Sequence, residues 1–259
     1  MTNLFSSIGN KVNNGLASIG KAQRFLLGVL RLKLSLKYLG WLNVEIYKLG
    51  VLSLPIILLA GLFIGMVVSL QGYNTLDKFG STSELGQLLA LSIFRELGPV
   101  ITALLFAGRA GSSLTAELGL MQSTEQISSM QMMGIDPKLR ILSPRFFASL
   151  IVMPLLTTLF CSVAVIGGYL VGCVWLGLDD GIFWSNMRYA VSFENDVLGG
   201  LLKSFIFGFF ISWIALLQGF FTKPCASGIA YSTTKTVVYA SLLVLLLDFV
   251  LTTLMIGGW

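Results

Sequence analysis

The hydrophobic positions of this chain gather in long apolar runs. The first clear run, residues 49–70, holds 22 residues without a charge, and about 20 apolar residues are enough for one helix to cross a bilayer. Four further runs follow, separated by polar or charged segments. The pattern predicts an all-α integral membrane protein in which residues 49–259 form one transmembrane domain, with five spans at about residues 49–70, 85–108, 146–175, 197–221 and 236–256.

Two of the runs carry features that bear on helix packing. Gly61 and Gly65 have the GxxxG spacing that lets another helix approach closely, although in a glycine-rich membrane protein this spacing also arises by chance. The third run continues to position 178 and has 33 uncharged residues, more than one perpendicular span needs. We expect it to tilt, to extend past the bilayer, or to bend at Pro154 and Gly167-Gly168.

The first 48 residues differ from the rest because they are basic. They carry seven Lys or Arg residues and one acid, Glu45, interleaved with aromatic and aliphatic residues at near-helical spacing. This pattern is typical of an amphipathic helix in the membrane interface, so residues 1–48 are predicted to form an N-terminal basic interfacial segment. A solvated basic leader is the alternative. A cleavable signal peptide is disfavoured, because no compact apolar region followed by a small-residue site occurs near the start.

Composition favours a membrane protein and disfavours an enzyme. Of the 259 residues, 55% are hydrophobic and 11% charged, whereas a soluble domain carries about 25% charged residues. The chain has no histidine, which removes the commonest metal ligand and the commonest general base, so neither a metal site nor a catalytic residue is predicted. Cys161, Cys173 and Cys225 show no paired spacing and are interpreted as packing residues.

Charges between the apolar runs predict the orientation in the membrane. Thirteen Lys or Arg residues fall in the N-terminal segment and in the connections at 109–145 and 218–235. The opposite side carries two basic residues, Lys78 and Arg188, and six acids: Asp77, Glu84, Asp179, Asp180, Glu194 and Asp196. By the positive-inside rule the N-terminus is cytoplasmic, and an odd number of spans places Trp259 outside.

Arg95 and Glu96 are adjacent inside the second apolar run. Charges at this depth are costly, so such a pair needs a partner, a water-filled cavity or a function. The Arg95 guanidinium suits a phosphate oxygen, whereas Glu96 would repel phosphate and would instead pair with an arginine, orient water or be protonated. The alternative is that both residues only tie helices together. Lys203 and Asp248 are similarly predicted to form an ion pair between the fourth and fifth spans.

The connection between the second and third spans contains a short predicted helix. It reads AELGLMQSTEQISSMQMMGIDPKLRILSPR over residues 116–145. The signals for this helix are Ser123 or Thr124 as its cap, Glu125 and Gln126 in its first turn, and Gly134 at its end. Its exposed face would carry flexible methionines suited to a groove on another protein: Met130, Met132 and Met133. The alternative is that they pack against the membrane end of the same chain.

A phosphate-loop motif near the start is not convincing. Residues 15–21 read G-x-x-x-x-G-K, but Ala22 replaces the Ser or Thr that would bind magnesium, and no strand precedes the motif. The chain is therefore not predicted to be an ATPase itself.

Three motifs succeed one another along the chain in a specific order. They are GLFIGMVVSLQGY, then RELGPVITALLFAGRAGSSLTAELGLMQSTEQISSMQMMGIDPKLRILSPRF, then LDFVLTTLM. Together they resemble the MlaE (YrbE) family of ABC permeases over the chain from about residue 45. The resemblance implies a permease subunit, in the Gram-negative inner membrane, of a transporter that moves phospholipids between that membrane and a periplasmic carrier and so maintains outer-membrane lipid asymmetry.

The resemblance also implies partners. Such permeases work as homodimers with an ABC ATPase (MlaF-like) that holds ATP and Mg, a STAS-domain protein (MlaB-like) and a hexameric periplasmic MCE-domain protein (MlaD-like). No cofactor is expected on this chain itself, and no nucleic acid.

By motif match, the resemblance implies two sites. The lipid cavity between two copies would be lined by Arg95, Glu96, Leu97, Val68, Leu76 and Phe79. The coupling helix that docks on the ATPase would be residues 125–134, including Glu125, Gln126, Met130, Met133 and Gly134. The EAA-type loop of bacterial importers places its glycine closer to its glutamate than Glu125 and Gly134 are here, so importer docking details do not transfer.

Two other functions remain as alternatives. A secondary transporter or channel would use Arg95, Glu96, Lys203 and Asp248 as an ion relay, but it would be expected to contain inverted repeats, and the sequence shows none. An integral membrane lipid enzyme would turn over without ATP, but the lack of histidine and of clustered carboxylates disfavours it.

Overall fold

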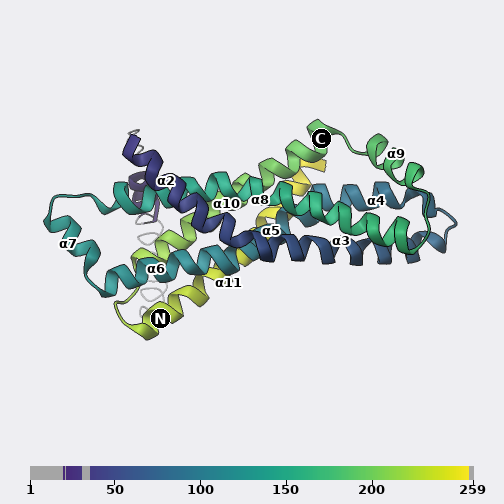
Figure 1. Ribbon diagram of the computed structural model, residues 1–259. Helices are drawn as coiled ribbons and strands as arrows, with labels where there is room; N and C mark the ends of the chain where they lie inside the picture. Colours follow the sequence, from purple (N-terminus) through teal and green to yellow (C-terminus); the bar gives the residue numbers. More distant parts are fainter. Residues whose placement is uncertain (1–19, 21, 31–35, 257–259) are drawn as a thin grey trace, which may run out of the picture.

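The structure, a computed structural model, describes residues 20, 22–30 and 36–256 and contains no strand among them. Five helical segments are long and apolar enough to cross a membrane: Tyr38–Asp77, Thr82–Ser123, Lys138–Trp175, Phe193–Phe220 and Ala226–Met255. They form one elongated bundle, with the short helix α7 at one end and α9 at the other (Figure 1). The predicted all-α membrane architecture with five spans is confirmed.

Short 3-10 or π-helical turns, labelled η, join the α-helices within most spans. In chain order the elements up to the second span are α2 (Leu36–Leu49), η1 (Val51–Ser53), α3 (Leu54–Asp77), η2 (Thr82–Glu84), α4 (Leu85–Ser92), η3 (Ile93–Leu97), α5 (Gly98–Phe106), η4 (Ala107–Gly111) and α6 (Ser112–Ser123). The remaining elements are α7 (Gln126–Met132), η5 (Lys138–Leu142), α8 (Ser143–Tyr169), η6 (Leu170–Trp175), α9 (Asp180–Ala190), η7 (Phe193–Val197), α10 (Leu198–Phe220) and α11 (Ala226–Ile256).

The predicted interfacial segment is only partly within the described residues. Positions 1–19, 21 and 31–35 lie outside them, and the described remainder is helical at 22–29 and in α2. Phe25 and Val29 are buried in a hydrophobic cluster with Phe146 of α8 and Leu216 of α10. This part of the segment therefore packs on the bundle, and its position in the membrane interface stays a prediction.

The GxxxG glycines lie at a close contact between α3 and α8. A methyl group on Gly61 would come within 2.9 Å of the Phe160 carbonyl oxygen, and one on Gly65 would overlap the backbone of Ala164. Small residues therefore let these two helices approach with their backbones nearly in contact. The third span is not interrupted at the positions where a bend was expected: α8 runs as one helix through Pro154 and the glycines 167 and 168, and changes to a π turn only at η6.

Two arginines expected at loop positions lie inside helices instead. Arg109, expected to end the second span, is in η4, and the helix continues for fourteen residues beyond it to Ser123. Its Nη1 donates to the Lys48 carbonyl at 2.7 Å and to the Ser53 hydroxyl at 3.1 Å. The guanidinium thus donates to a carbonyl in the last turn of α2, where carbonyls lack partners within the helix. Its charge therefore need not lie in a loop.

Arg145 is the second of these arginines, and it is buried near the start of α8. Its side chain is 3% exposed and forms two ion pairs, from Nε to Glu45 Oε1 at 3.3 Å and from Nη2 to Glu117 Oε2 at 2.8 Å. These three residues, the Arg145 cluster, connect α8 to α2 and α6. Because two carboxylates compensate it, this cation can lie inside the bundle near α7.

Candidate functional site

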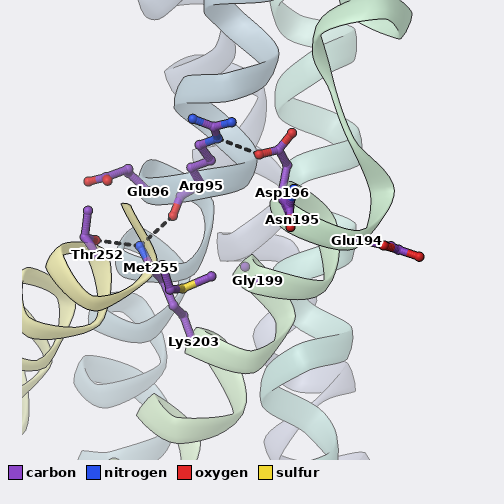
Figure 2. Close-up of a pocket in the computed structure, with 10 residues that line it drawn as sticks. Arg95, Glu96, Glu194, Asn195, Asp196, Gly199, Lys203, Thr252 and Met255 are labelled. Atoms are coloured by element: carbon purple, nitrogen blue, oxygen red, sulfur yellow. Dashed lines mark hydrogen bonds and ion pairs between the residues drawn. The ribbon is translucent and has the colours of Figure 1, made fainter. Parts of the chain in front are cut away.

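A cavity of about 470 Å³ lies between η3, the start of α10 and the end of α11 (Figure 2). Seven of the ten residues that line it are polar or charged. The charged and hydroxyl side chains that line it are Arg95, Glu96, Glu194, Asp196, Lys203 and Thr252. A polar cavity inside apolar spans is the place where a polar part of a ligand can bind.

The backbone at Arg95 is shaped by a proline. Pro99 has no N–H to donate to the carbonyl four residues earlier, which is the carbonyl of Arg95, and the helix takes a π turn there. Lys203 Nζ from α10 donates to this carbonyl at 2.9 Å. The RELGP sequence therefore leaves a backbone acceptor open, and a lysine from another span fills it.

The Arg95 side chain is held by Asp196, a residue of η7. Arg95 Nε donates to Asp196 Oδ1 at 2.5 Å, and Asp196 Oδ2 also accepts from the Ser192 N–H at 2.7 Å. Asp196 is 1% exposed, whereas the Arg95 side chain is 46% exposed. No described residue accepts a hydrogen bond from the Arg95 Nη groups, which in Figure 2 lie on the side of Arg95 away from Lys203 and Met255. The outer edge of the guanidinium is free for a ligand.

Lys203 joins α10 to α11 beneath Arg95. Its Nζ donates to Thr252 Oγ1 at 2.6 Å and lies 3.5 Å from Asp248 Oδ1, and the side chain is 3% exposed. The structure thus brings together the two residues predicted to pair between these spans. It adds two shorter contacts, to Thr252 and to the Arg95 carbonyl, that the sequence did not indicate.

Glu96 lines the same cavity without an ion pair to any described residue. Arg95 pairs with Asp196, and the expected pairing of Glu96 with an arginine is not found among the described residues. The charge pattern puts Asp196 in a loop outside the membrane, and sequence reasoning misses it as a site residue. The available signal is spacing, because Asp196 and Lys203 are seven residues apart and share one helix face with Gly199 and Gly200 between them.

The other residues expected in the lipid cavity lie elsewhere in this chain. Leu97 is half-buried and does not line the cavity, and Val68 packs against the main hydrophobic core. Leu76 is half-buried near the end of α3, and Phe79, just beyond it, is 77% exposed. Of the six, the structure brings Arg95 and Glu96 to one cavity, and contact of any of them with lipid stays a prediction.

The short helix between the second and third spans is α7, as the sequence indicated, but it begins differently. Ser123 and Thr124 both donate their hydroxyls back to the Leu120 carbonyl at 2.9 Å, so neither caps α7. Glu125 precedes the helix with φ 56°, in the left-handed region, and caps no backbone N–H. The capping prediction was wrong because these hydroxyls satisfy the end of α6 instead of the start of α7.

The end of α7 agrees with the sequence signal. Gly134 has φ 75°, its N–H donates to the Gln131 carbonyl at 3.0 Å, and the Ile135 N–H donates to the Met130 carbonyl at 2.9 Å. This pair of bonds is the Schellman motif, which stops a helix at a glycine.

The side chains of α7 divide into one anchor and an open apolar face. Ile127 is buried, and Gln126 at the first turn is exposed. Met132 and Met133 are 82% and 67% exposed, and Met130 is half-buried. The helix therefore presents flexible apolar side chains at the end of the bundle.

Known proteins place the chain in one family. The family model described as "Permease MlaE" matches residues 43–254. The intermembrane phospholipid transport system permease protein MlaE of Haemophilus influenzae is 50% identical over 259 residues, which is 100% of this chain and 99% of that protein. A probable ABC transporter permease protein of Rickettsia bellii is 33% identical over 98% of both chains. The chloroplastic protein trigalactosyldiacylglycerol 1 of Arabidopsis thaliana is 33% identical over 84% of this chain and 63% of its own length. On this full-length similarity, the chain belongs to the MlaE family of ABC transporter permeases.

Proposed function

We propose that this chain is the membrane-spanning subunit of an ATP-driven transporter that moves phospholipids between the inner membrane of a Gram-negative bacterium and a periplasmic carrier. The observation that carries the proposal is the full-length similarity to the Haemophilus influenzae protein, whose name states intermembrane phospholipid transport. ATP hydrolysis belongs to a separate subunit.

The geometry of the cavity supports a phospholipid as the substrate. The free edge of Arg95 offers two N–H groups to a phosphate, in the bidentate arrangement that guanidinium groups form with phosphate oxygens. Long apolar helix faces surround this polar point, as two acyl chains require. A lipid can therefore present its phosphate to Arg95 while its chains stay in an apolar environment.

One helical segment connects this cavity to α7. Arg95 lies about a third of the way along Thr82–Ser123, and α7 follows the far end of this segment. At 1.5 Å per residue, 42 helical residues span about 60 Å, enough to cross the membrane with a turn beyond it. A movement of α7 would therefore act on the helix that carries the cavity residues.

The same proposal includes partners and orientation. The exposed methionines of α7 dock on an ABC ATPase in the cytoplasm, a STAS-domain protein binds that ATPase, and a hexameric MCE-domain protein covers the periplasmic side. Two copies of the permease enclose the lipid, with the N-terminus cytoplasmic and Trp259 periplasmic. This orientation puts the α7 end of the bundle, where the basic connections lie, on the cytoplasmic side.

Transfer of labelled phospholipid between membranes tests the function. Proteoliposomes holding the permease with its copurifying subunits should move phospholipid to a soluble acceptor only when ATP is hydrolysed. Transport by the permease alone under an ion gradient would instead support the secondary transporter.

Charge substitutions on α7 test the docking. Met132→Glu with Met133→Glu should abolish copurification of the ATPase, because two carboxylates would have to be buried in an apolar groove. Tyr189→Glu, at a residue 91% exposed on α9 at the other end, is the matched control and should leave copurification intact. An ATPase that still binds the double variant would rule out docking through these methionines.

A further inference from the structure

The charges around the cavity do not cancel. Both of its cations already have a carboxylate: Arg95 has Asp196 at 2.5 Å, and Lys203 has Asp248 at 3.5 Å. Glu96 lines the cavity without an ion pair among the described residues. With these groups ionised, the cavity has an excess of negative charge, located next to the guanidinium that is free to take a phosphate.

This excess sets a condition on the ligand. A phosphate that approaches the Arg95 edge also approaches Glu96, and in a partly buried cavity like charges repel more strongly than in water. A ligand that carries a cation a few bonds from its phosphate meets both residues with opposite charges. A ligand whose headgroup has no cation gains no attraction from Glu96, and its phosphate is repelled by that carboxylate.

We propose that Glu96 makes the cavity selective for zwitterionic phospholipids whose headgroup carries an ammonium, such as phosphatidylethanolamine, over anionic ones such as phosphatidylglycerol. Arg95 binds the phosphate, and Glu96 binds the ammonium. Asp196 is a positioning residue, because it occupies Nε and so fixes the guanidinium of a side chain that lines the cavity. The selectivity rests on the proposed function, since it concerns the substrate of the same transporter.

The assignment is specific to Glu96. Glu194 also lines the cavity, but in Figure 2 its side chain points away from Arg95 on the far side of Asp196. Asp196 is fully engaged by Arg95 and Ser192. Glu96 follows Arg95 in η3 and lines the same cavity, and in Figure 2 its carboxylate lies on the side of Arg95 opposite Asp196.

The test measures transport of two headgroups at once. The whole transporter complex is reconstituted with equal amounts of phosphatidylethanolamine and phosphatidylglycerol, and the ATP-dependent transfer of each lipid is counted by mass spectrometry. We expect the wild type to favour phosphatidylethanolamine and Glu96→Gln to lower the ratio about threefold, the effect of one partly exposed ion pair. Glu96→Asp should keep the ratio. Glu84→Gln, which removes a charge outside the cavity, is the matched control and should also keep it.

Each outcome separates the selectivity from the transport function. A wild type that moves both lipids equally, or an unchanged ratio in Glu96→Gln, overturns the selectivity and leaves transport standing. An equal shift in Glu194→Gln overturns the assignment to Glu96. Absence of ATP-dependent transfer of either lipid by the wild type refutes the proposed function itself. If Glu96→Gln does not assemble, native mass spectrometry of the wild type from the same mixture decides, and retention of phosphatidylglycerol over phosphatidylethanolamine overturns the selectivity.

Discussion

Arg95 and Arg145 are both arginines paired with carboxylates from other helices, and each leaves part of its guanidinium without a partner among the described residues, but only in Arg95 is the side chain exposed. Arg145 is 3% exposed and uses Nε and Nη2 on two glutamates. Arg95 is 46% exposed, lines a cavity, and gives only Nε to Asp196, while its Nη groups have no acceptor among the described residues. The same side chain therefore connects helices at one end of the bundle, and toward the other end it is the group that we propose binds a ligand.

The difference shows how to separate a structural charge from a functional one. A buried charge stripped of its partner destabilises the fold strongly, whereas a half-exposed pair contributes little to stability because water screens it. The Arg95–Asp196 ion pair is costly to desolvate, and it leaves the exposed Nη groups of Arg95 without a partner among the described residues. Such a pair is better explained by ligand binding than by stability. Substitutions at the two arginines should therefore affect different properties of the protein.

The largest expected effect is on stability, at Arg145. Arg145→Met should cost about 3–5 kcal/mol or prevent folding, because it leaves Glu45 and Glu117 facing each other without the cation. Arg95→Met should cost less than Arg145→Met, because it leaves one carboxylate, Asp196, without its cation instead of two, and the Ser192 N–H still donates to that carboxylate. The stability of both variants is measured by thermal unfolding of the purified proteins, with size-exclusion chromatography as the readout of the fraction that stays folded. Equal losses of stability in the two variants would contradict the distinction between a structural Arg145 and a functional Arg95.

The second effect is on transport, at Asp196. Asp196→Asn keeps the shape of the side chain and an oxygen for Arg95, but it loses the charge that fixes the guanidinium. We expect ATP-dependent lipid transfer to fall about tenfold, the consequence of about 1.4 kcal/mol, with a smaller loss of unfolding temperature than Arg145→Met shows. Asp196→Glu, which keeps the charge, should recover part of the transfer. If Asp196→Glu transfers lipid no better than Asp196→Asn, the charge of Asp196 is not what transport needs, and the residue is only structural.

A third and smaller effect is expected at Pro99. Pro99→Ala restores an N–H that can bond to the Arg95 carbonyl within the helix, and this competes with the bond from Lys203 Nζ at 2.9 Å. Transfer should fall about threefold, since one hydrogen bond in the site is exchanged, while the unfolding temperature should not decrease. A large loss of stability would show that Pro99 matters for packing instead of for the open carbonyl.

Features that depend on neighbouring residues alone could be predicted from the sequence. Apolar runs indicated the five spans, and Gly134 indicated the end of α7, because local composition and backbone conformation decide both. The helical positions of Arg109 and Arg145 could not be predicted, because they depend on partners more than 25 residues away in the sequence. Asp196 could not be predicted as a site residue for the same reason, because it contacts Arg95, which lies 101 positions earlier.

The smallest effect concerns which end of the bundle faces the cytoplasm, and Cys225 can report it. This exposed thiol lies between α10 and α11 at the α7 end, while Cys161 and Cys173 are buried. A hydrogen bond with Ser227 lowers the pKa of the Cys225 thiol. Because the thiolate reacts with maleimides, half-maximal labelling should occur at a lower pH than for an ordinary exposed cysteine, and Ser227→Ala should move it upward. A membrane-impermeant maleimide should label inverted membrane vesicles and spare intact spheroplasts. Labelling from the periplasm would reverse the bundle, placing the Arg145 cluster outside and the Arg95 cavity toward the cytoplasm, where a periplasmic carrier could not reach it.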